Sequence, residues 1–363
     1  MGGIMILTIS QGALQRAMQT TSKAVSNDAT NPLLGGVLIT ADDKVTFQST
    51  DLTTSIRHEA KAVVEEPGSV VLPSKLLTSA VKNMPDKPVK IEADGNGAKI
   101  RCGTQRLRLN VIPASDFPEF PEVEPEASVT IPTAYLASMA DGAVRVTSKD
   151  KARPVLAGVL LSVADGSMTM VATDAYRLAV AQAKVEAEGS IEAIIPGSAL
   201  RDALSAPGIG EDVTVSASQS QVRISSGDTT YVTRRIEGQF PKWRMLLPNE
   251  VKTSATFVPE QLAEALKRVS VVAVSNPSVR VSVGEDEVGL FAMSPDQGES
   301  TERVDASVEG DPMTIGLNYH FLLDGVSSMS VEARMDLVDP MQPAVLRSYG
   351  AIDRTYLLMP VRQ

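Results

Sequence analysis

Cysteine and histidine are scarce in this sequence of 363 residues, which contains one cysteine and two histidines. Cys102 therefore has no partner for a disulfide within the chain. His58 and His320 lie far apart in the sequence and belong to no metal-ligand motif, so we expect no zinc site and no other metal. Nothing in the sequence indicates a redox function, and we expect no cofactor.

Motifs that carry catalysis or bind nucleotides are also missing. Gly95-Asn96-Gly97 lies between alternating strand residues and predicts a hairpin turn. Gly208-Ile-Gly210 lacks the third glycine of a nucleotide-binding loop. The sequence has neither a Gly-x-Ser-x-Gly elbow nor a His-Glu-x-x-His helix. We therefore expect no catalytic residue and no enzyme.

Aromatic residues and long apolar runs are few. Aromatic side chains make up 4% of the chain and are not interleaved with basic residues, unlike the stacking platforms of proteins that bind single strands. Apolar runs such as residues 155–161 are far shorter than the roughly 20 residues of a transmembrane helix. The first residues lack the basic start and apolar stretch of a signal peptide. We expect a cytoplasmic protein without a membrane partner.

Positive charge is in the minority, with 34 lysines and arginines against 44 aspartates and glutamates and a net charge of −10. Taken over the whole chain, this balance argues against nucleic acid as a partner. The length suggests two or three domains, at roughly 150 residues per domain.

A pattern of a short strand followed by a helix occurs three times. It is found at 6–9 before 12–25, at 129–131 before 133–146, and at 255–258 before 259–272. The starts are spaced by about a third of the chain, as in an internal repeat. The many other short strands are punctuated by Gly, Asp and Asn, which predicts an α+β protein rich in antiparallel hairpins.

Further segments repeat in the same order. Residues 32–39 and 44–51 resemble 154–161 and 167–174, with a looser third copy at 279–283 and 288–294. A second helix signal follows at 71–77, 194–200 and 315–321, and the copies end in hairpins at 89–111, 213–236 and 329–361. Proline-rich segments at 113–125 and 240–248 separate the copies. We expect domains at 1–124, 125–249 and 250–363; chance similarity is the alternative.

Several predicted helices carry basic residues on their polar faces. In the helix expected at 74–84, Leu76, Leu77 and Val81 fall on one apolar stripe, and Lys75 and Lys82 lie outside it. If the acidic excess lies on strands and loops, the helices supply the positive track that nucleic acid requires. Each residue taken singly is more often an ordinary solvated position. A bound duplex would be contacted through its backbone, without reading of base sequence.

Motifs along nearly the whole chain resemble one family, the bacterial DNA polymerase III beta subunit or sliding clamp. These motifs are Asn31-Pro-Leu-Leu-Gly-Gly36, Ser49-Thr-Asp-Leu52, Ala114-Ser-Asp-Phe-Pro118, Ala172-Thr-Asp-Ala-Tyr-Arg-Leu-Ala179, Gly238-Gln-Phe-Pro241, Ile315-Gly-Leu-Asn318 and Met359-Pro-Val-Arg362. No single motif would decide the resemblance, but in this order and spacing, on a threefold repeat, the motifs are hard to explain otherwise.

The resemblance implies three domains of the DNA-clamp fold and a head-to-tail homodimer that closes into a ring. Antiparallel sheets would form the outside of the ring and helices would line the hole. The implied function is that of a polymerase processivity factor that encircles duplex DNA without sequence specificity. The implied partners are double-stranded DNA, a second copy of the chain, the polymerase III alpha subunit, the clamp loader and other proteins with a clamp-binding motif.

The resemblance also implies three sets of site residues. A pocket for partner peptides between the second and third domains would comprise Leu156, Thr173, Ala175, Tyr176, Arg177, Leu178, Pro241, Met245, Leu246, Asn318, Phe321, Met341, Pro343, Met359, Pro360 and Val361. The residues expected to face DNA are Lys23, Lys75, Lys82, Arg145, Lys149, Lys151, Arg153, Arg201 and Lys267. The dimer interface would include Leu107, Leu109, Ala273 and Val274.

The sequence departs from the family at a few of these positions. Asp28 and Gly197 stand where many members have a basic residue, Met245 where many have arginine, and Gln363 where leucine is common. These departures keep a second hypothesis open, a triplicated scaffold that binds peptides without clamping DNA. An enzyme is the third hypothesis and would require a pocket of convergent carboxylates.

Overall fold

The computed structural model describes residues 4–26, 31–150, 152–186, 190–207, 209–273 and 277–361. The chain divides into two compact units. The first spans Met1–Leu136 and Ser198–Arg235, and the second spans Ala137–Gly197 and Ile236–Gln363. Both units contain antiparallel sheets and helices, which confirms the predicted α+β class.

The first unit contains two sheets, in which every described strand pair is antiparallel. One has the order β5 (Ala62–Glu66), β1 (Met5–Ser10), β7 (Pro88–Asp94), β8 (Gly97–Cys102), β9 (Gln105–Leu109). The other has the order β10 (Ala127–Pro132), β15 (Asp212–Ala217), β16 (Gln221–Ser226), β17 (Thr229–Arg234), β4 (Thr54–Ala60), β3 (Val45–Thr50), β2 (Gly36–Ala41), β6 (Gly68–Pro73). Gly95 and Asn96 form the turn between β7 and β8, as predicted.

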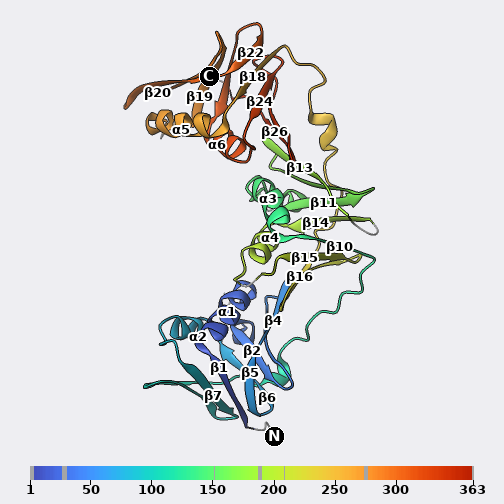
Figure 1. Cartoon of the computed structure of the whole chain (residues 1–363), viewed down its shortest axis with the longest axis vertical. Coiled ribbons are helices and arrows are strands. Elements are labelled where there is room, and N and C mark those ends of the chain that lie inside the picture. The colour runs from blue at the N-terminus through green and yellow to red at the C-terminus, as the bar shows by residue number, and fades with distance from the viewer. Residues whose placement is uncertain are drawn as a thin grey trace. The chain divides into compact units, whose positions relative to one another are not determined.

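Two helices of the first unit, α1 (Gln11–Thr21) and α2 (Ser74–Lys82), pack side by side (Figure 1). The Ser10 hydroxyl caps α1 by accepting from the Ala13 N–H at 3.3 Å. The apolar faces of both helices enter one core with strands of both sheets. Leu77 and Val81 are buried there as predicted, whereas Leu76 at the margin of the stripe is 60% exposed.

The second unit also contains two antiparallel sheets. The larger has the order β14 (Ile191–Pro196), β11 (Gly158–Ala164), β12 (Ser167–Thr173), β13 (Arg177–Lys184), β26 (Asp353–Leu358), β25 (Ala344–Ser348), β24 (Ala333–Leu337), β18 (Thr253–Phe257), β22 (Ser307–Gly310). The smaller has the order β21 (Gly298–Asp305), β20 (Glu287–Ser294), β19 (Ser278–Gly284), β23 (Met313–Asn318).

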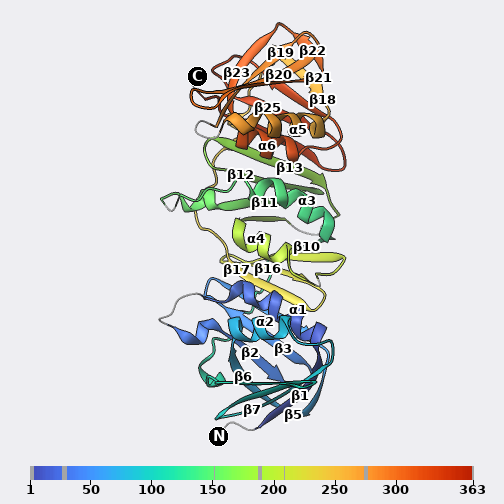
Figure 2. The same cartoon turned by 90° about the vertical axis from the view of Figure 1, so that its left-hand side faces the viewer.

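Helices α5 (Pro259–Val269) and α6 (Tyr319–Ser327) of the second unit lie side by side (Figure 2). Helices α3 (Thr133–Val144) and α4 (Gly197–Leu204) each cross a boundary between the units in the sequence. The short 3-10 helices are Ser22–Ala24, Pro32–Gly35, Ala114–Asp116, Pro154–Ala157, Trp243–Leu246 and Ser270–Val272.

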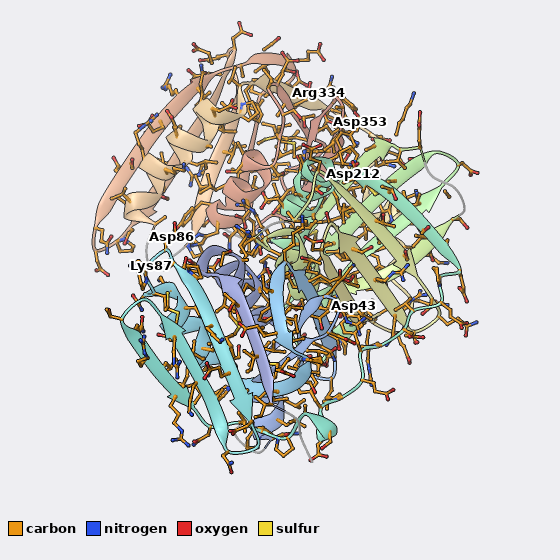
Figure 3. The ribbon with its side chains drawn as sticks, turned by 60° about the horizontal axis from the view of Figure 1, so that its bottom comes forward. Asp43, Asp86, Lys87, Asp212, Arg334 and Asp353 are labelled. Atoms are coloured by element: carbon orange, nitrogen blue, oxygen red, sulfur yellow. The ribbon has the colours of Figure 1, made fainter. Side chains whose placement is uncertain are left out.

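A buried carboxylate joins two strands of the larger sheet of the second unit. Asp336 on β24 has a side chain only 5% exposed. It accepts from the Nε atoms of Arg334, labelled in Figure 3, at 2.6 Å and of Arg347 at 3.0 Å. The two guanidinium groups compensate the charge that burial would otherwise disfavour.

The order of elements repeats three times, from β1 to β9, from β10 to β17 and from β18 to β26. The sheets continue from one copy into the next. In the first unit β4 of the first copy pairs with β17 of the second, and in the second unit β13 pairs with β26 of the third. The last strand of a copy thus pairs with the fourth strand of the copy before it. We call these two pairings the first seam and the second seam.

Candidate protein-binding and DNA-binding sites

A tight turn between β12 and β13 presents Tyr176 to solvent. The Asp174 Oδ1 atom accepts from the backbone N–H groups of Tyr176 at 2.9 Å and Arg177 at 3.0 Å. Ala175 adopts a left-handed conformation with φ of 77°, and Tyr176 is 62% exposed. The first copy has the same turn, in which Asp51 Oδ1 accepts from the two corresponding N–H groups.

The Arg177 guanidinium, at the start of β13, is bound almost completely within the second unit. Its Nη1 donates to Asp324 Oδ2 at 2.6 Å and to the Tyr356 hydroxyl at 3.1 Å. Its Nε donates to Asp174 Oδ2 at 3.0 Å, and its Nη2 to the backbone oxygen of Arg145 at 2.8 Å. A guanidinium has five N–H groups, so these four hydrogen bonds leave one of them unused.

Burial and hydrogen bonding act in opposite directions on this group. Burial lowers the pKa of Arg177, but Tyr356, Asp324 and Asp174 together hold that pKa above its ordinary value. Burial also raises the pKa of the Tyr356 hydroxyl. Arg177 is therefore a permanent positive charge whose counter-charges come from β12–β13 and α6.

Asn318, the last residue of β23, precedes α6 and fixes its first turn. Its Oδ1 accepts from the backbone N–H groups of His320 at 3.0 Å and Phe321 at 3.4 Å, which makes it a helix cap. The Arg177 guanidinium lies over the Phe321 ring, 4.2 Å from its centroid. The cap uses the Asn318 oxygen and leaves its amide N–H groups for other contacts.

An apolar cluster covers the larger sheet beneath the 3-10 helix Trp243–Leu246. Its buried members are Val171, Leu178, Val180, Trp243, Val345 and Leu357, with Leu160, Phe240 and Leu247 packed against them. Trp243 is 7% exposed, whereas Met245 is 79% and Leu246 is 49% exposed. Leu178 is thus part of the floor, and Met245 and Leu246 present apolar surface beside it.

The predicted pocket residues gather at one end of the larger sheet. Arg177, Leu358 and Ala344 are cross-strand neighbours on β13, β26 and β25. The backbone N–H of Met359 donates to the backbone oxygen of Tyr176 at 2.9 Å, so the main chains of these two residues lie side by side. Met359 is 43% exposed. The remaining residues of the set are Leu156 and Thr173, which are buried, Pro241, Pro343, Pro360 and Val361, which are half-buried, and Ala175 and Met341, which are exposed.

Lys23, predicted to face DNA, is already engaged by another part of the first unit. Its Nζ lies 3.6 Å from Asp202 Oδ1 and donates to the Ser205 hydroxyl at 3.2 Å, both on or just after α4. The side chain is 30% exposed. This ion pair compensates much of the positive charge that a phosphate would require.

The other predicted basic residues fall into two groups. Arg145 pairs with Asp141 at 2.8 Å, and Arg153 pairs with Asp150 at 2.9 Å. In the part of the chain that the structure describes, no carboxylate lies within 4 Å of the exposed residues Lys75, Lys82, Lys149, Arg201 and Lys267. Lys151 lies outside the described residues, as does Asp28.

The predicted dimer residues lie in different settings. Leu107 and Leu109 are on β9, an edge strand of its sheet, where Leu109 belongs to the core and Leu107 packs against it. Ala273 is only 2% exposed within its own chain, so it offers little surface to a partner. The edge strands of the smaller sheet of the second unit are β21 and β23. Val274 lies outside the described residues, and Gln363 does too.

The described residues contain no group of three or more His, Cys, Asp or Glu side chains that could hold a metal ion. No helix among those same residues is long and apolar enough to cross a bilayer.

Sequence analysis missed the partners of Arg177. Asp324 and Tyr356 are 147 and 179 residues away along the chain, so no local pattern links them to it. The role of Asp174 in the turn could have been predicted from the sequence, because the Thr-Asp pair occurs at the equivalent place in two copies, as Thr50-Asp51 and Thr173-Asp174.

Comparison with known proteins matches the whole chain to one family. The family models of the N-terminal, central and C-terminal domains of the DNA polymerase III beta subunit match residues 5–121, 130–242 and 244–362 of this chain, respectively. The beta sliding clamp of Streptomyces coelicolor is 32% identical over 374 residues, covering 99% of each chain.

Solved structures of sliding clamps are similar over the same length. The DNA polymerase sliding clamp of Bacillus subtilis superposes with a TM-score of 0.93 and 27% identity, covering 99% of this chain and 100% of that one. The sliding clamp of Pseudomonas aeruginosa bound to griselimycin superposes with a TM-score of 0.91 and 25% identity, with the same coverage.

Proposed function

Because this chain belongs to the DNA polymerase III beta subunit family, the beta sliding clamps, we propose that it closes around duplex DNA as a dimeric ring. The chain has three clamp domains and is a polymerase processivity factor, not an enzyme. We propose domain boundaries at 1–124, 125–249 and 250–363. The matched ranges 5–121 and 130–242 fall within the first two domains, and the third range, 244–362, begins six residues before the third.

The observation that carries the ring is that the first and the third copy each leave one strand without the pairing that joins neighbouring copies. The last strand of the second copy pairs with the fourth strand of the first, and the last strand of the third pairs with the fourth of the second. Among the described strands, only β9, the last strand of the first copy, and β21, the fourth strand of the third, lack this pairing. Two copies of the chain can satisfy both edges head to tail, because each supplies one β9 and one β21.

The residues that meet at this interface can be proposed by comparing the hairpin registers of β9 and β21 with those of the strands in the first seam. Thr54 pairs with Thr233 in the first seam. Leu109 is equivalent to Thr233, because each lies seven residues after the last strand residue before its hairpin turn, which is Cys102 in one case and Ser226 in the other. Gly298 holds the place of Thr54, since Val288 pairs with Val304 as Val45 pairs with Ala60.

This register sets opposite charges across the interface. If Leu109 pairs with Gly298, the exposed Arg108 of one protomer faces the exposed Glu299 of its partner. Leu107 would face Ser300 and keep its apolar contacts within its own core. We therefore propose β9 and β21 as the interface and move the third-domain side of it from Ala273 and Val274 to β21.

Contact with DNA is proposed for basic side chains on helices and adjoining loops. Lys75, Lys82, Lys149, Arg201 and Lys267 supply charge that no described carboxylate within 4 Å neutralises; Arg145, Arg153, Lys151 and Lys23 complete the set. A topological link needs only weak phosphate contacts, and the net charge of −10 opposes adhesion of DNA to the rest of the surface.

Partner docking is proposed at the end of the larger sheet of the second unit. The exposed Tyr176, Met245, Leu246, Met341 and Met359 offer an adaptable apolar surface. A short apolar peptide of the polymerase III alpha subunit, the clamp loader or another protein with a clamp-binding motif suits it. Asn318 retains amide N–H groups to orient such a peptide. Because its partner is duplex DNA, we propose that the protein acts in the cytoplasm.

Retention on DNA of two topologies tests the proposal. A dimer loaded on nicked circular DNA should stay bound through gel filtration and be released when the circle is linearised, because a ring slides off a free end. Equal loss from both templates would contradict encirclement. It would favour the second hypothesis, an adaptor that binds peptides at the Met359 surface without stimulating the polymerase.

A further inference from the structure

The first seam holds a pocket at the place where the second seam has its apolar cluster. This pocket has a volume of about 400 Å³. Its wall includes Arg57 on β4 and Thr230 on β17, the two strands of the first seam, and Arg223 and Ser225 on the adjacent strand β16. The segment after the first copy supplies Phe120 and Glu122. All of these residues belong to the first unit.

The threefold repeat shows what has changed between the two seams. Arg57 lies six residues after Asp51, as Val180 lies six residues after Asp174 in the equivalent turn. Arg223 pairs with Val232 on the last strand of its copy, as Val345 pairs with Leu357. Two valines buried in the second seam are therefore replaced by two arginines in the first.

An aromatic residue occupies the equivalent position at both seams. Phe120 follows Phe117-Pro118 as Trp243 follows Phe240-Pro241. Trp243 packs on the valines, whereas the Phe120 ring lies under the Arg57 guanidinium, 4.0 Å from its carbon to the ring centroid. The first seam thus keeps the architecture of an anchored aromatic side chain but sets it beside positive charge.

Neither arginine has a close counter-charge. Among the residues that the structure describes, no carboxylate lies within 4 Å of the Arg57 or Arg223 guanidinium. Burial lowers the pKa of Arg57, although Glu59 and Glu122 oppose that effect from a distance. The Arg223 Nε is buried and has no hydrogen-bond partner. A desolvated donor without an acceptor is costly, and an anionic ligand would satisfy it.

We propose that this pocket binds a phosphate group between Arg57 and Arg223. A guanidinium presents its N–H groups in a planar fork that matches phosphate oxygens, and two of them neutralise a dianion. The hydroxyl groups of Ser225 and Thr230 line the same wall and can donate further hydrogen bonds. Glu122 and Glu124 also line the pocket and set a limit on affinity, because they repel an anion.

Equilibrium dialysis of the full-length protein with ³²P-labelled inorganic phosphate tests the site. The wild type should bind one phosphate per chain, and Arg57→Gln and Arg223→Gln should each weaken binding by about tenfold or more, as expected for loss of one charged partner. Glu122→Gln should tighten binding by a few fold, because it removes a repulsive charge. Arg234→Gln, a matched charge loss at the exposed end of β17, should leave binding unchanged.

Two further arms keep the result interpretable. If a glutamine variant melts at a lower temperature by circular dichroism, Arg57→Lys and Arg223→Lys replace it and should bind more weakly than the wild type, because lysine lacks the fork. Displacement of the label by ATP at lower concentration than by phosphate would assign the site to nucleotide phosphates, and the reverse order to free phosphate. No saturable binding, or equal binding by the arginine variants and the wild type, would overturn the proposal. The retention test on circular DNA does not depend on this outcome.

Discussion

The Arg177 Nη1 atom lies 2.6 Å from the Asp324 Oδ2 atom, and this ion pair joins β13 of the second copy to α6 of the third. The side chains are 10% and 33% exposed. Arg177 also binds the backbone oxygen of Arg145 and lies over the Phe321 ring. One guanidinium thus connects the end of α3, the proposed docking surface and α6.

Replacing Asp324 with asparagine should weaken this connection. Arg177 would keep Asp174 and Tyr356 but lose one charged acceptor, so we expect a loss of about 1–2 kcal/mol in the free energy of unfolding after allowing for the exposure of Asp324. Peptide affinity should fall as well, because the Phe321 ring and the Tyr176 turn are held by the same group. Urea unfolding and fluorescence anisotropy with a clamp-binding peptide measure the two effects.

Asp141→Asn is the matched control for that substitution. Asp141 pairs with Arg145 on an exposed surface, with side chains 58% and 47% exposed. Exposed pairs contribute about 0–1 kcal/mol. If Asp141→Asn destabilises the protein as much as Asp324→Asn, the special position of the Arg177 pair is refuted.

Different substitutions should impair peptide docking and retention on DNA separately. Met359→Ala removes an exposed thioether from the docking surface, so peptide affinity should fall by about tenfold, with retention on circular DNA intact. The triple substitution of Lys149, Lys151 and Arg153 to Ala should shorten retention and leave peptide affinity intact. Met293→Ala, another exposed methionine, is the control for the first. Loss of both activities in both variants would contradict two separate surfaces.

Local patterns in the sequence predicted most of the fold. Hydrophobic periodicity and turn residues are local, so the threefold repeat and the hairpin turn at Gly95 and Asn96 were available from short segments. The family's motifs added the clamp fold. The prediction that Leu76 lies on the buried face was wrong, because an apolar stripe only two turns long does not define its own margins well.

Long-range pairing was not available from the sequence. Lys23 was predicted to face DNA, but its partner Ser205 is 182 residues away and belongs to the second copy. The same limit applies to Ala273, whose burial depends on the packing of the elements around it. A basic helix residue is therefore predictable as a residue type, whereas its availability to a ligand is not.

The interface proposed between β9 and β21 predicts a charge effect on dimerisation. Arg108→Glu would set two carboxylates opposite each other, a change of about 1 kcal/mol at each interface. A head-to-tail ring has two such interfaces, so the dissociation constant of the dimer should rise by about 30-fold. Sedimentation over a dilution series measures it.

A second substitution should restore the dimer. Arg108→Glu combined with Glu299→Arg exchanges the charges and keeps them opposite, so its dissociation constant should return close to that of the wild type. Lys61→Glu is a charge reversal of the same size at an exposed residue between β4 and β5, away from β9. A dimer weakened equally by Lys61→Glu would mean that net charge, and not the β9–β21 register, controls association.

The buried His58 should make the first unit sensitive to acid. Its Nδ1 lies 2.8 Å from the Thr229 hydroxyl across the first seam. Burial lowers the pKa of His58, and Arg16 lowers it further, against the opposing charges of Asp228 and Glu59. The unfolded chain therefore takes up this proton at a higher pH than the folded one. Stability from His58 is complete above the unfolded value of about 6.5 and is lost as pH falls below it, by at most about 1.4 kcal/mol per pH unit.

Urea unfolding at a series of pH values from about 8 to 5 measures this loss. His58→Gln should flatten the pH dependence of the unfolding midpoint over that range, because glutamine can still donate to or accept from the Thr229 hydroxyl but cannot titrate. His320→Gln removes the other histidine, which is exposed, and should leave the wild-type slope. A His58→Gln slope equal to the wild type would mean that carboxylates, rather than the histidine at the first seam, set the acid sensitivity.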